Sequence, residues 1–225
     1  MRFFAIVPLL IAALAVAGWG GGARGASSPQ SAAAATTSSL ACSNVSKPAP
    51  RAAAKLKPPA ARLDPAKRWS LTFRTSCGTF VVLLLPRTSP RATASLVALA
   101  HKRFFDGTIF HRIVPGFVIQ GGDPTQSGAG GPGYTTVDTP APSTRYVTGV
   151  VAMAKTGSEP RGAAGSQFFV MTGPAPTLSP DYAVVGRVTS GLAVVERIGR
   201  LGDPADPNGT PTKVVVIERV TVATR

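Results

Sequence analysis

An arginine and a glutamine stand within an otherwise apolar, strand-forming segment, FHRIVPGFVIQGGD at residues 110–123. Arginine keeps its charge, and burying that charge unpaired is costly, so Arg112 needs either an acidic neighbour in the sheet or a ligand. Because side chains alternate along a strand, Arg112 and Gln120 are expected on one face. The Pro115-Gly116 pair predicts a bend that brings Phe117 to the same wall.

Other chemistry finds little support among the remaining residues. Two His and two Cys provide no convincing metal-ligand cluster, so we expect no metal. Ser166 lacks evident His and Asp partners for nucleophilic catalysis. His111 has the opposite strand parity to Arg112, and His101 falls at an expected helix end, where a dipole interaction explains it.

Two further motifs follow in order, GVVAMAK at residues 149–155 and GSQFFVMT at 165–172. Together with the first segment they resemble the cyclophilin family of peptidyl-prolyl cis/trans isomerases. The resemblance extends over residues 69–225. Each motif alone recurs by chance, whereas three in this order are specific.

The resemblance implies an enzyme that needs no cofactor. Rotation about an X-Pro bond has a barrier of roughly 18–20 kcal/mol, and no bond is made or broken. Catalysis needs a pocket for the proline ring, a donor to the prolyl nitrogen and polar groups that hold the swinging carbonyl. By resemblance, Arg112 is the donor, Gln120 orients it, and Phe117 completes the catalytic set.

The resemblance also implies a substrate-binding set around these residues. Val118, Phe169 and Leu178 wall the proline pocket, although for Val118 and Leu178 a plain core role explains the sequence nearly as well. Tyr182 lies at the rim, and Gln167 adds a polar contact to the substrate. The backbone of Ala154 and Lys155 grips the peptide by strand addition.

Four positions depart from the best-known eukaryotic members of the family. Thr177 stands where those carry Trp, Tyr182 where they carry His, Val118 where Met is common and Lys155 where Asn is common. Isomerisation remains the expectation because Arg112 and its neighbours are retained, whereas cyclosporin sensitivity is left open. The pattern resembles the bacterial, exported branch.

The leading functional prediction is isomerisation of X-Pro bonds during the folding of exported proteins. The alternative is a non-catalytic proline-peptide binding module or chaperone of the cell envelope. Proline-containing polypeptides are the expected partners in both cases. We expect a monomer.

The sequence of residues 68–225 predicts a mainly β architecture, a closed antiparallel barrel of about eight strands capped by two helices. Strands are expected at 69–75, 79–85, 147–154, 167–172, 183–188 and 213–222, besides the Arg112 segment. One helix starts after Ser89-Pro90 and ends near His101, and a short one spans 192–198. The Gly-rich stretch 121–134 is expected to be a loop lining the binding face.

Three domains are predicted along the chain. Residues 1–17 match a signal peptide or N-terminal anchor, residues 18–67 an Ala/Ser/Pro/Lys-rich disordered linker, and residues 68–225 the isomerase domain. The expected location is therefore exported, either secreted or tethered to the outer side of the cytoplasmic membrane.

The formal net charge of +14 is concentrated before the folded part. Residues 42–75 carry eight basic residues and one acidic residue, against fourteen and nine in residues 76–225. In the linker part of residues 42–75, Ala and Pro space the basic residues and no aromatic residues interleave with them to stack on bases, so nucleic acid is not expected as a partner. The alternatives are contact with the envelope or membrane surface and a plain solvated linker.

Cys42 and Cys77 are the only two cysteines. An even count in an exported chain suggests one disulfide between them. Lipidation of Cys42 is the competing reading, since Leu40-Ala41-Cys42 partly resembles a lipoprotein cleavage site. Its distance from the apolar N-terminal run disfavours it.

Overall fold

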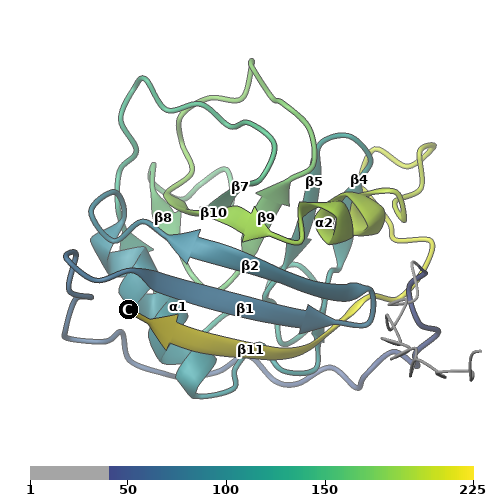
Figure 1. Ribbon diagram of the computed structural model, residues 1–225, viewed down its shortest axis with the longest axis horizontal. Helices are drawn as coiled ribbons and strands as arrows, with labels where there is room; N and C mark the ends of the chain where they lie inside the picture. Colours follow the sequence, from purple (N-terminus) through teal and green to yellow (C-terminus); the bar gives the residue numbers. More distant parts are fainter. Residues whose placement is uncertain (1–40) are drawn as a thin grey trace, which may run out of the picture. The chain divides into compact units, whose positions relative to one another are not determined.

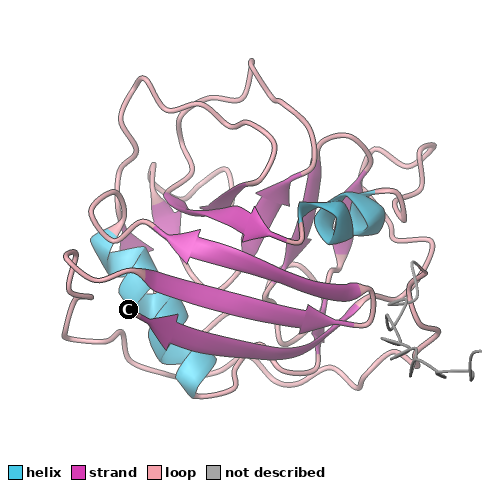
Figure 2. Ribbon diagram, viewed as in Figure 1, coloured by secondary structure: helices cyan, strands magenta, loops and turns pink. Residues whose placement is uncertain are grey.

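The computed structural model of the chain describes residues 41–225 and is mainly β (Figure 2). The expected signal or anchor at 1–17 and the first part of the linker lie outside these residues. The strands are β1 (Trp69–Thr75), β2 (Gly78–Leu84), β3 (Thr108–Ile109), β4 (Arg112–Val114), β5 (Val118–Gly121), β6 (Thr136–Val137), β7 (Val150–Met153), β8 (Ala163–Ala164), β9 (Phe168–Met171), β10 (Val184–Ser190) and β11 (Val216–Thr224), and the helices are α1 (Pro90–His101) and α2 (Leu192–Gly199).

Nine strands form one antiparallel sheet in the order β3-β11-β1-β2-β10-β7-β9-β5-β4, and β6 pairs with β8 separately. Helix α1 packs on β11 and β6, and α2 packs on β2, β4 and β5 (Figure 1). The mainly β class and the two helices agree with the sequence prediction. Among the described residues the edge strands β3 and β4 do not pair, so the sheet is a curled half-barrel and closure is not seen.

Aromatic side chains fill the main core between the sheet and α1. Phe168 contacts Phe73, Phe105 and Phe110, with ring centroids 5.2, 6.0 and 6.3 Å away, and Phe73 stacks on Phe80 at 4.8 Å. Phe168 and Phe169 are neighbours on β9 and therefore face opposite sides of the sheet. Phe168 belongs to the main core, whereas Phe169 belongs to a second apolar cluster on the other side.

Helix α1 begins where the sequence predicts, with Ser89 at its N-cap and Pro90 in its first turn. The Ser89 hydroxyl, however, donates to the Val184 carbonyl rather than capping the helix. The carboxylate of Asp138 accepts the backbone N–H groups of Arg91 and Ala92 instead. A residue 46 positions away thus supplies the cap.

The β4–β5 hairpin places Arg112 directly opposite Gln120. Pro115 and Gly116 form the turn, and Gly116 has a φ of 70°, which glycine adopts without strain. A Cβ on Gly173 would lie 2.1 Å from the Gly116 carbonyl oxygen, so a second glycine lets the chain pass close behind the turn. The predicted bend is therefore a hairpin turn.

Residues 42–67, which we call the strap, differ from the expected disordered linker. They run as an extended segment along the outside of the fold, purple to blue in Figure 1. The backbone N–H groups of Arg51, Ala54 and Leu56 donate to the loop carbonyls of Pro124, Gly131 and Pro132. Leu56 and Leu63 pack against the main core. These contacts supply the ordering energy that composition alone did not indicate.

A disulfide joins Cys42 at the start of the strap to Cys77 in the β1–β2 turn, with an S–S distance of 2.05 Å. The Ser43 N–H donates to the Ser76 carbonyl beside it, and Lys213 Nζ donates to the Cys42 carbonyl. The strap is thus fastened at its first residue. No helix within residues 41–225 is long and apolar enough to cross a membrane.

Candidate active site

A cavity of about 380 Å³ with both apolar and polar lining residues includes Arg112, and we call it the Arg112 cavity. Strands β4, β5 and β9, the residues after β7 and the loop before β10 contribute to it. Each of its nine lining residues was named as a site residue from the sequence. They are Arg112, Phe117, Val118, Gln120, Ala154, Lys155, Phe169, Leu178 and Tyr182.

Arg112 is half-buried and has no acidic partner among the residues that the structure describes. Its Nε donates to the Asn208 carbonyl at 3.0 Å, and neither Nη atom has a hydrogen-bond partner in residues 41–225. The sequence had left open a sheet arginine neutralised by an acidic neighbour, and the structure does not have one. The charge remains available to a ligand in the cavity.

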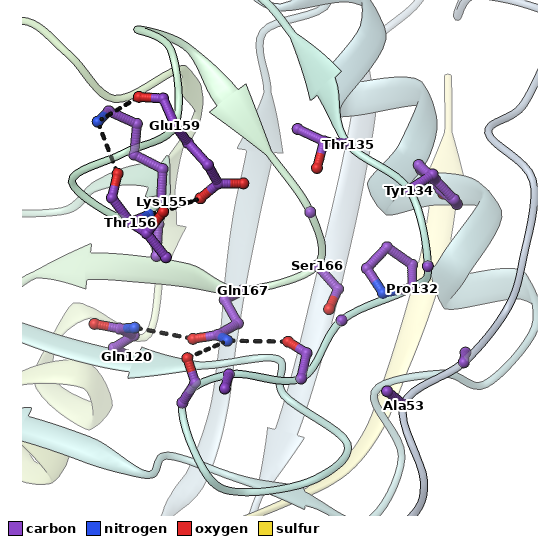
Figure 3. Close-up of a pocket in the computed structure, with 18 residues that line it drawn as sticks. Ala53, Gln120, Pro132, Tyr134, Thr135, Lys155, Thr156, Glu159, Ser166 and Gln167 are labelled. Carbon is purple, nitrogen blue, oxygen red and sulfur yellow. Dashed lines mark hydrogen bonds between the residues drawn. The ribbon is translucent and has the colours of Figure 1, made fainter.

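Gln120 and Gln167 form a pair that fixes both amides. Gln120 Nε2 donates to Gln167 Oε1 at 3.1 Å, and Gln167 Nε2 donates to the carbonyls of Gly128 and Gly130 at 2.8 and 3.0 Å (Figure 3). Gln167 does not line the Arg112 cavity. It lines a neighbouring cavity of about 610 Å³, which we call the Gln167 cavity, and it therefore positions Gln120.

The rings of Phe169 and Tyr182 form an aromatic wall of the Arg112 cavity, and a further ring packs behind them. Phe169 meets the ring of Tyr182 edge-on, with centroids 5.4 Å apart. Buried Tyr146 packs against both rings, and its hydroxyl donates to the Tyr182 carbonyl at 2.8 Å and accepts the Tyr182 N–H at 2.9 Å. Burial raises the pKa of Tyr146, so the hydroxyl stays protonated. The sequence analysis missed Tyr146 because it lies outside every motif.

In the segment after β7, fewer backbone N–H groups than expected are free to pair with an added peptide strand. The Ala154 N–H already donates to the Gln167 carbonyl at 2.9 Å. Within the described chain, the Lys155 N–H has no backbone acceptor. Lys155 Nζ donates to the carbonyls of Thr156 and Glu159 and lies 5.8 Å from the Tyr182 ring centroid. A bound peptide would therefore pair with Lys155 rather than with the Ala154 N–H.

Asp123 organises the glycine-rich loop that lines the Gln167 cavity, and sequence reasoning missed it. Its fully buried carboxylate accepts the N–H groups of Thr125, Ser127, Gly128 and Gly130 and the Thr125 hydroxyl. Burial by itself raises the pKa of Asp123, but these hydrogen bonds outweigh it and hold the pKa below its ordinary value.

His111 neighbours Arg112 in the chain but does not line the Arg112 cavity. Neither ring nitrogen has a hydrogen-bond partner in the described chain. Burial lowers the pKa of His111, and the nearby Asp123 carboxylate offsets this only in part. The imidazole is therefore neutral near pH 7 and is not part of the Arg112 constellation.

The arrangement suits charge stabilisation rather than bond cleavage. The Ser166 hydroxyl is buried and donates to the Gly122 carbonyl, so it is not poised as a nucleophile. Residues 41–225 contain no cluster of His, Cys, Asp and Glu side chains that could hold a metal ion. What remains is a guanidinium with free N–H groups that lines the Arg112 cavity.

Comparison with known proteins decides the family. A model of the cyclophilin type peptidyl-prolyl cis-trans isomerase family matches residues 70–222. The chain belongs to this family. Peptidyl-prolyl cis-trans isomerase B of Streptomyces anulatus is 35% identical over 179 residues, which cover 71% of this chain and 99% of that one. Peptidyl-prolyl cis-trans isomerase A of Mycobacterium tuberculosis is 34% identical over 178 residues, which cover 71% and 95%.

A fungal relative and a solved structure agree with this assignment. A peptidyl-prolyl cis-trans isomerase-like 1 of Neurospora crassa is 36% identical over 152 residues, covering 66% of this chain and 90% of the relative. A crystal structure of a Cryptosporidium parvum cyclophilin type isomerase superposes with a TM-score of 0.63 at 27% identity, over 70% of this chain and 99% of that one. This cyclophilin is therefore a peptidyl-prolyl cis-trans isomerase.

Proposed function

We propose that this cyclophilin accelerates X-Pro isomerisation during the folding of exported proteins. The observation that carries the catalytic part is the Arg112 cavity, where a charge without an acidic partner lies beside an apolar wall. A crystal structure of the Cryptosporidium parvum relative was determined in the presence of the dipeptide Ala-Pro. We extend proline-peptide binding to this chain.

In the proposed mechanism the proline ring enters the Arg112 cavity between Phe117, Phe169 and Leu178. As the C–N bond twists, amide resonance is lost and the prolyl nitrogen becomes a hydrogen-bond acceptor. A free Nη–H of Arg112 donates to that nitrogen, an interaction that the planar ground state cannot make. Gln120 is the cross-strand neighbour of Arg112, and its amide is held by Gln167. In this mechanism Gln120 helps to orient the guanidinium.

Replacing Arg112 by alanine tests this mechanism. Loss of one transition-state donor costs about 10²–10³ in kcat. We expect a fall of that order for Arg112→Ala in an isomerisation assay with a cis X-Pro peptide, while the affinity for the peptide changes much less. Arg187→Ala removes an exposed arginine of β10 as the control. Equal, measurable rates for Arg112→Ala and wild type would contradict the role of Arg112, whereas two inactive proteins that bind proline peptides equally would favour the binding module.

Export is the second part of the proposal. The charged start, short apolar run and Ala15-Val16-Ala17 site support cleavage after residue 17. The Cys42–Cys77 disulfide supports an oxidising compartment. Mass spectrometry of the protein from a culture separates the outcomes. A start near Gly18 in the medium agrees with secretion, an acylated Cys42 means tethering, and an intact Met1 contradicts processing.

A further inference from the structure

A third cavity, of about 590 Å³, shares Arg112 and Gln120 with the Arg112 cavity. Its remaining walls are the β3–β4 segment, the loop from Gln126 to Gly128 and the loop that includes Asn208 and Thr210. Lys47 of the strap completes the lining, and we call this space the Lys47 cavity. Lys47 lies outside residues 70–222, which the family model matches.

The Lys47 cavity carries positive charge without a counter-charge in its lining. Lys47 and Arg112 are its cationic residues, and no Asp or Glu lines it. Neither cation forms an ion pair within residues 41–225. His111 also lines the cavity but is neutral because burial lowers its pKa. The net charge of the lining side chains is therefore positive near pH 7.

The carboxylates of Asp206 and Asp123 lie near the Lys47 cavity, and both already accept hydrogen bonds from their own loops. Asp206 accepts the Asn208 N–H and both the N–H and the hydroxyl of Thr210. Asp123 accepts five hydrogen bonds within its own loop. Neither carboxylate pairs with Lys47 or Arg112, so both cations remain available to a bound group.

The strap holds Lys47 in place from both sides. Before it, the Cys42–Cys77 disulfide and the Ser43 N–H bond to Ser76 fasten the chain. After it, Gln126 Nε2 donates to the Pro48 carbonyl at 3.0 Å and the Arg51 N–H donates to Pro124 at 2.8 Å. Because the backbone is anchored here, less conformational entropy is lost when Lys47 contacts a ligand.

We propose that the Lys47 cavity is a subsite for an acidic side chain of the polypeptide substrate, close to the isomerised proline. The inference rests on the proposed function, because Arg112 and Gln120 place the cavity next to the reacting bond. The carboxylate interacts with Lys47 while Arg112 continues to serve the prolyl nitrogen. The enzyme thereby prefers X-Pro sites that have Glu or Asp nearby.

Isomerisation of matched peptides tests the preference. A series of X-Pro peptides carries Glu, Gln or Lys in turn at each position flanking the dipeptide. We expect kcat/KM for Glu to exceed that for Gln by about two- to five-fold at one position, the range that partly exposed ion pairs provide. Raising NaCl to about 0.5 M should shrink this ratio, because salt screens such pairs.

Two strap lysines give a matched pair of variants. Lys47→Ala should reduce the Glu/Gln ratio to about one and leave the rate for the Gln peptide unchanged, and Lys47→Glu should favour the Lys peptide instead. Lys57→Ala removes an equally exposed strap lysine that does not line the Lys47 cavity, and it should keep the wild-type ratio.

The outcomes separate this inference from the proposed function. Equal rates for Glu and Gln peptides at every position, or a ratio unchanged in Lys47→Ala, would overturn the acidic subsite even though the Gln peptide is isomerised. If no peptide is isomerised by the wild type, the proposed function itself is wrong. Unfolding midpoints of all three lysine variants, measured alongside, exclude a folding defect as the cause.

Discussion

Within residues 41–225, Arg112 is held at one nitrogen only, since its Nε donates to the Asn208 carbonyl and neither Nη atom has a partner there. A main-chain acceptor fixes the direction of the guanidinium without neutralising its charge. A carboxylate in that position would stabilise the resting side chain and weaken its interaction with a developing acceptor. The contact therefore favours donation to the substrate over internal pairing.

Tyr146 should act as a positioning residue for the aromatic wall. Tyr146→Phe leaves the Tyr182 N–H and carbonyl without their partner, so we expect a loss of about 1–3 kcal/mol in the free energy of unfolding. KM for proline peptides should rise while kcat changes little, because Arg112 is untouched. Urea unfolding and steady-state kinetics measure both effects. Tyr134→Phe removes a hydroxyl bonded to Ser95, away from the Arg112 cavity, and should leave KM unchanged.

Asp123 predicts an acid-sensitive contribution to stability. Its folded-state pKa lies below the unfolded value of about 3.9, so its carboxylate stabilises the fold above pH 4, and this stabilisation is lost as pH falls through the folded pKa. Asp123→Asn should therefore lower the free energy of unfolding at pH 7, with a smaller difference from wild type near pH 3. A constant difference across this range would contradict the account.

The sequence predicted site residues correctly where residues that meet in the site also lie close together in one sequence motif. Arg112, Phe117 and Gln120 fall in one segment, and strand alternation with a Pro-Gly turn was enough to bring them together. Asn208 lies 96 residues from Arg112, and Tyr146 lies 36 residues from Tyr182. No local pattern encodes such contacts, so only the fold reveals them.

At the scale of elements, the longer strands and both helices followed from local sequence patterns, whereas the two-residue strands β3, β6 and β8 and the strap did not. The composition of the strap gave only Leu56 and Leu63 as large apolar anchors across residues 42–67. Much of its remaining attachment is the Cys42–Cys77 disulfide and hydrogen bonding of its backbone to the loop at 124–132, which side-chain composition does not report. The sequence also did not predict the half-barrel. Whether the edge strands β3 and β4 pair depends on the curvature of the sheet, which the hydrophobic pattern of the strands does not report.

Loss of the disulfide should weaken the strap and spare catalysis. Cys42→Ser opens a loop with a sequence separation of 35, and we expect the free energy of unfolding to fall by up to about 3–4 kcal/mol. No strap residue lines the Arg112 cavity, so kcat/KM for a neutral peptide should stay within about two-fold of wild type. Denaturant unfolding with and without reductant checks the first effect. A stability equal to wild type would contradict it.

At the scale of the whole molecule, the strap fixes a row of cations on the surface. Seven exposed basic residues between 47 and 68 have no ion-pair partner within residues 41–225, and these are Lys47, Arg51, Lys55, Lys57, Arg62, Lys67 and Arg68. Such a row attracts anionic surfaces. We therefore propose that the strap contacts an anionic surface such as the cell envelope, which the sequence left open beside a plain solvated linker.

Vesicle binding tests this contact. Replacing Lys55, Lys57 and Arg62 together by Gln should weaken binding to anionic lipid vesicles at low salt, since each basic residue near such a surface contributes about 1 kcal/mol. Replacing exposed Arg145, Arg187 and Arg200 by Gln removes the same charge away from the strap. Equal weakening by both triples in a sedimentation assay would show that net charge alone, and not the strap, determines binding.

The covalent link between Cys42 and Cys77 also determines how the chain responds to a protease. A single cut anywhere between the two cysteines, for example after one of the exposed strap lysines, divides the polypeptide but liberates no fragment. The nicked molecule would migrate intact in a non-reducing gel and separate into two bands only after a thiol is added. Such damage would therefore leave both pieces joined by a covalent bond.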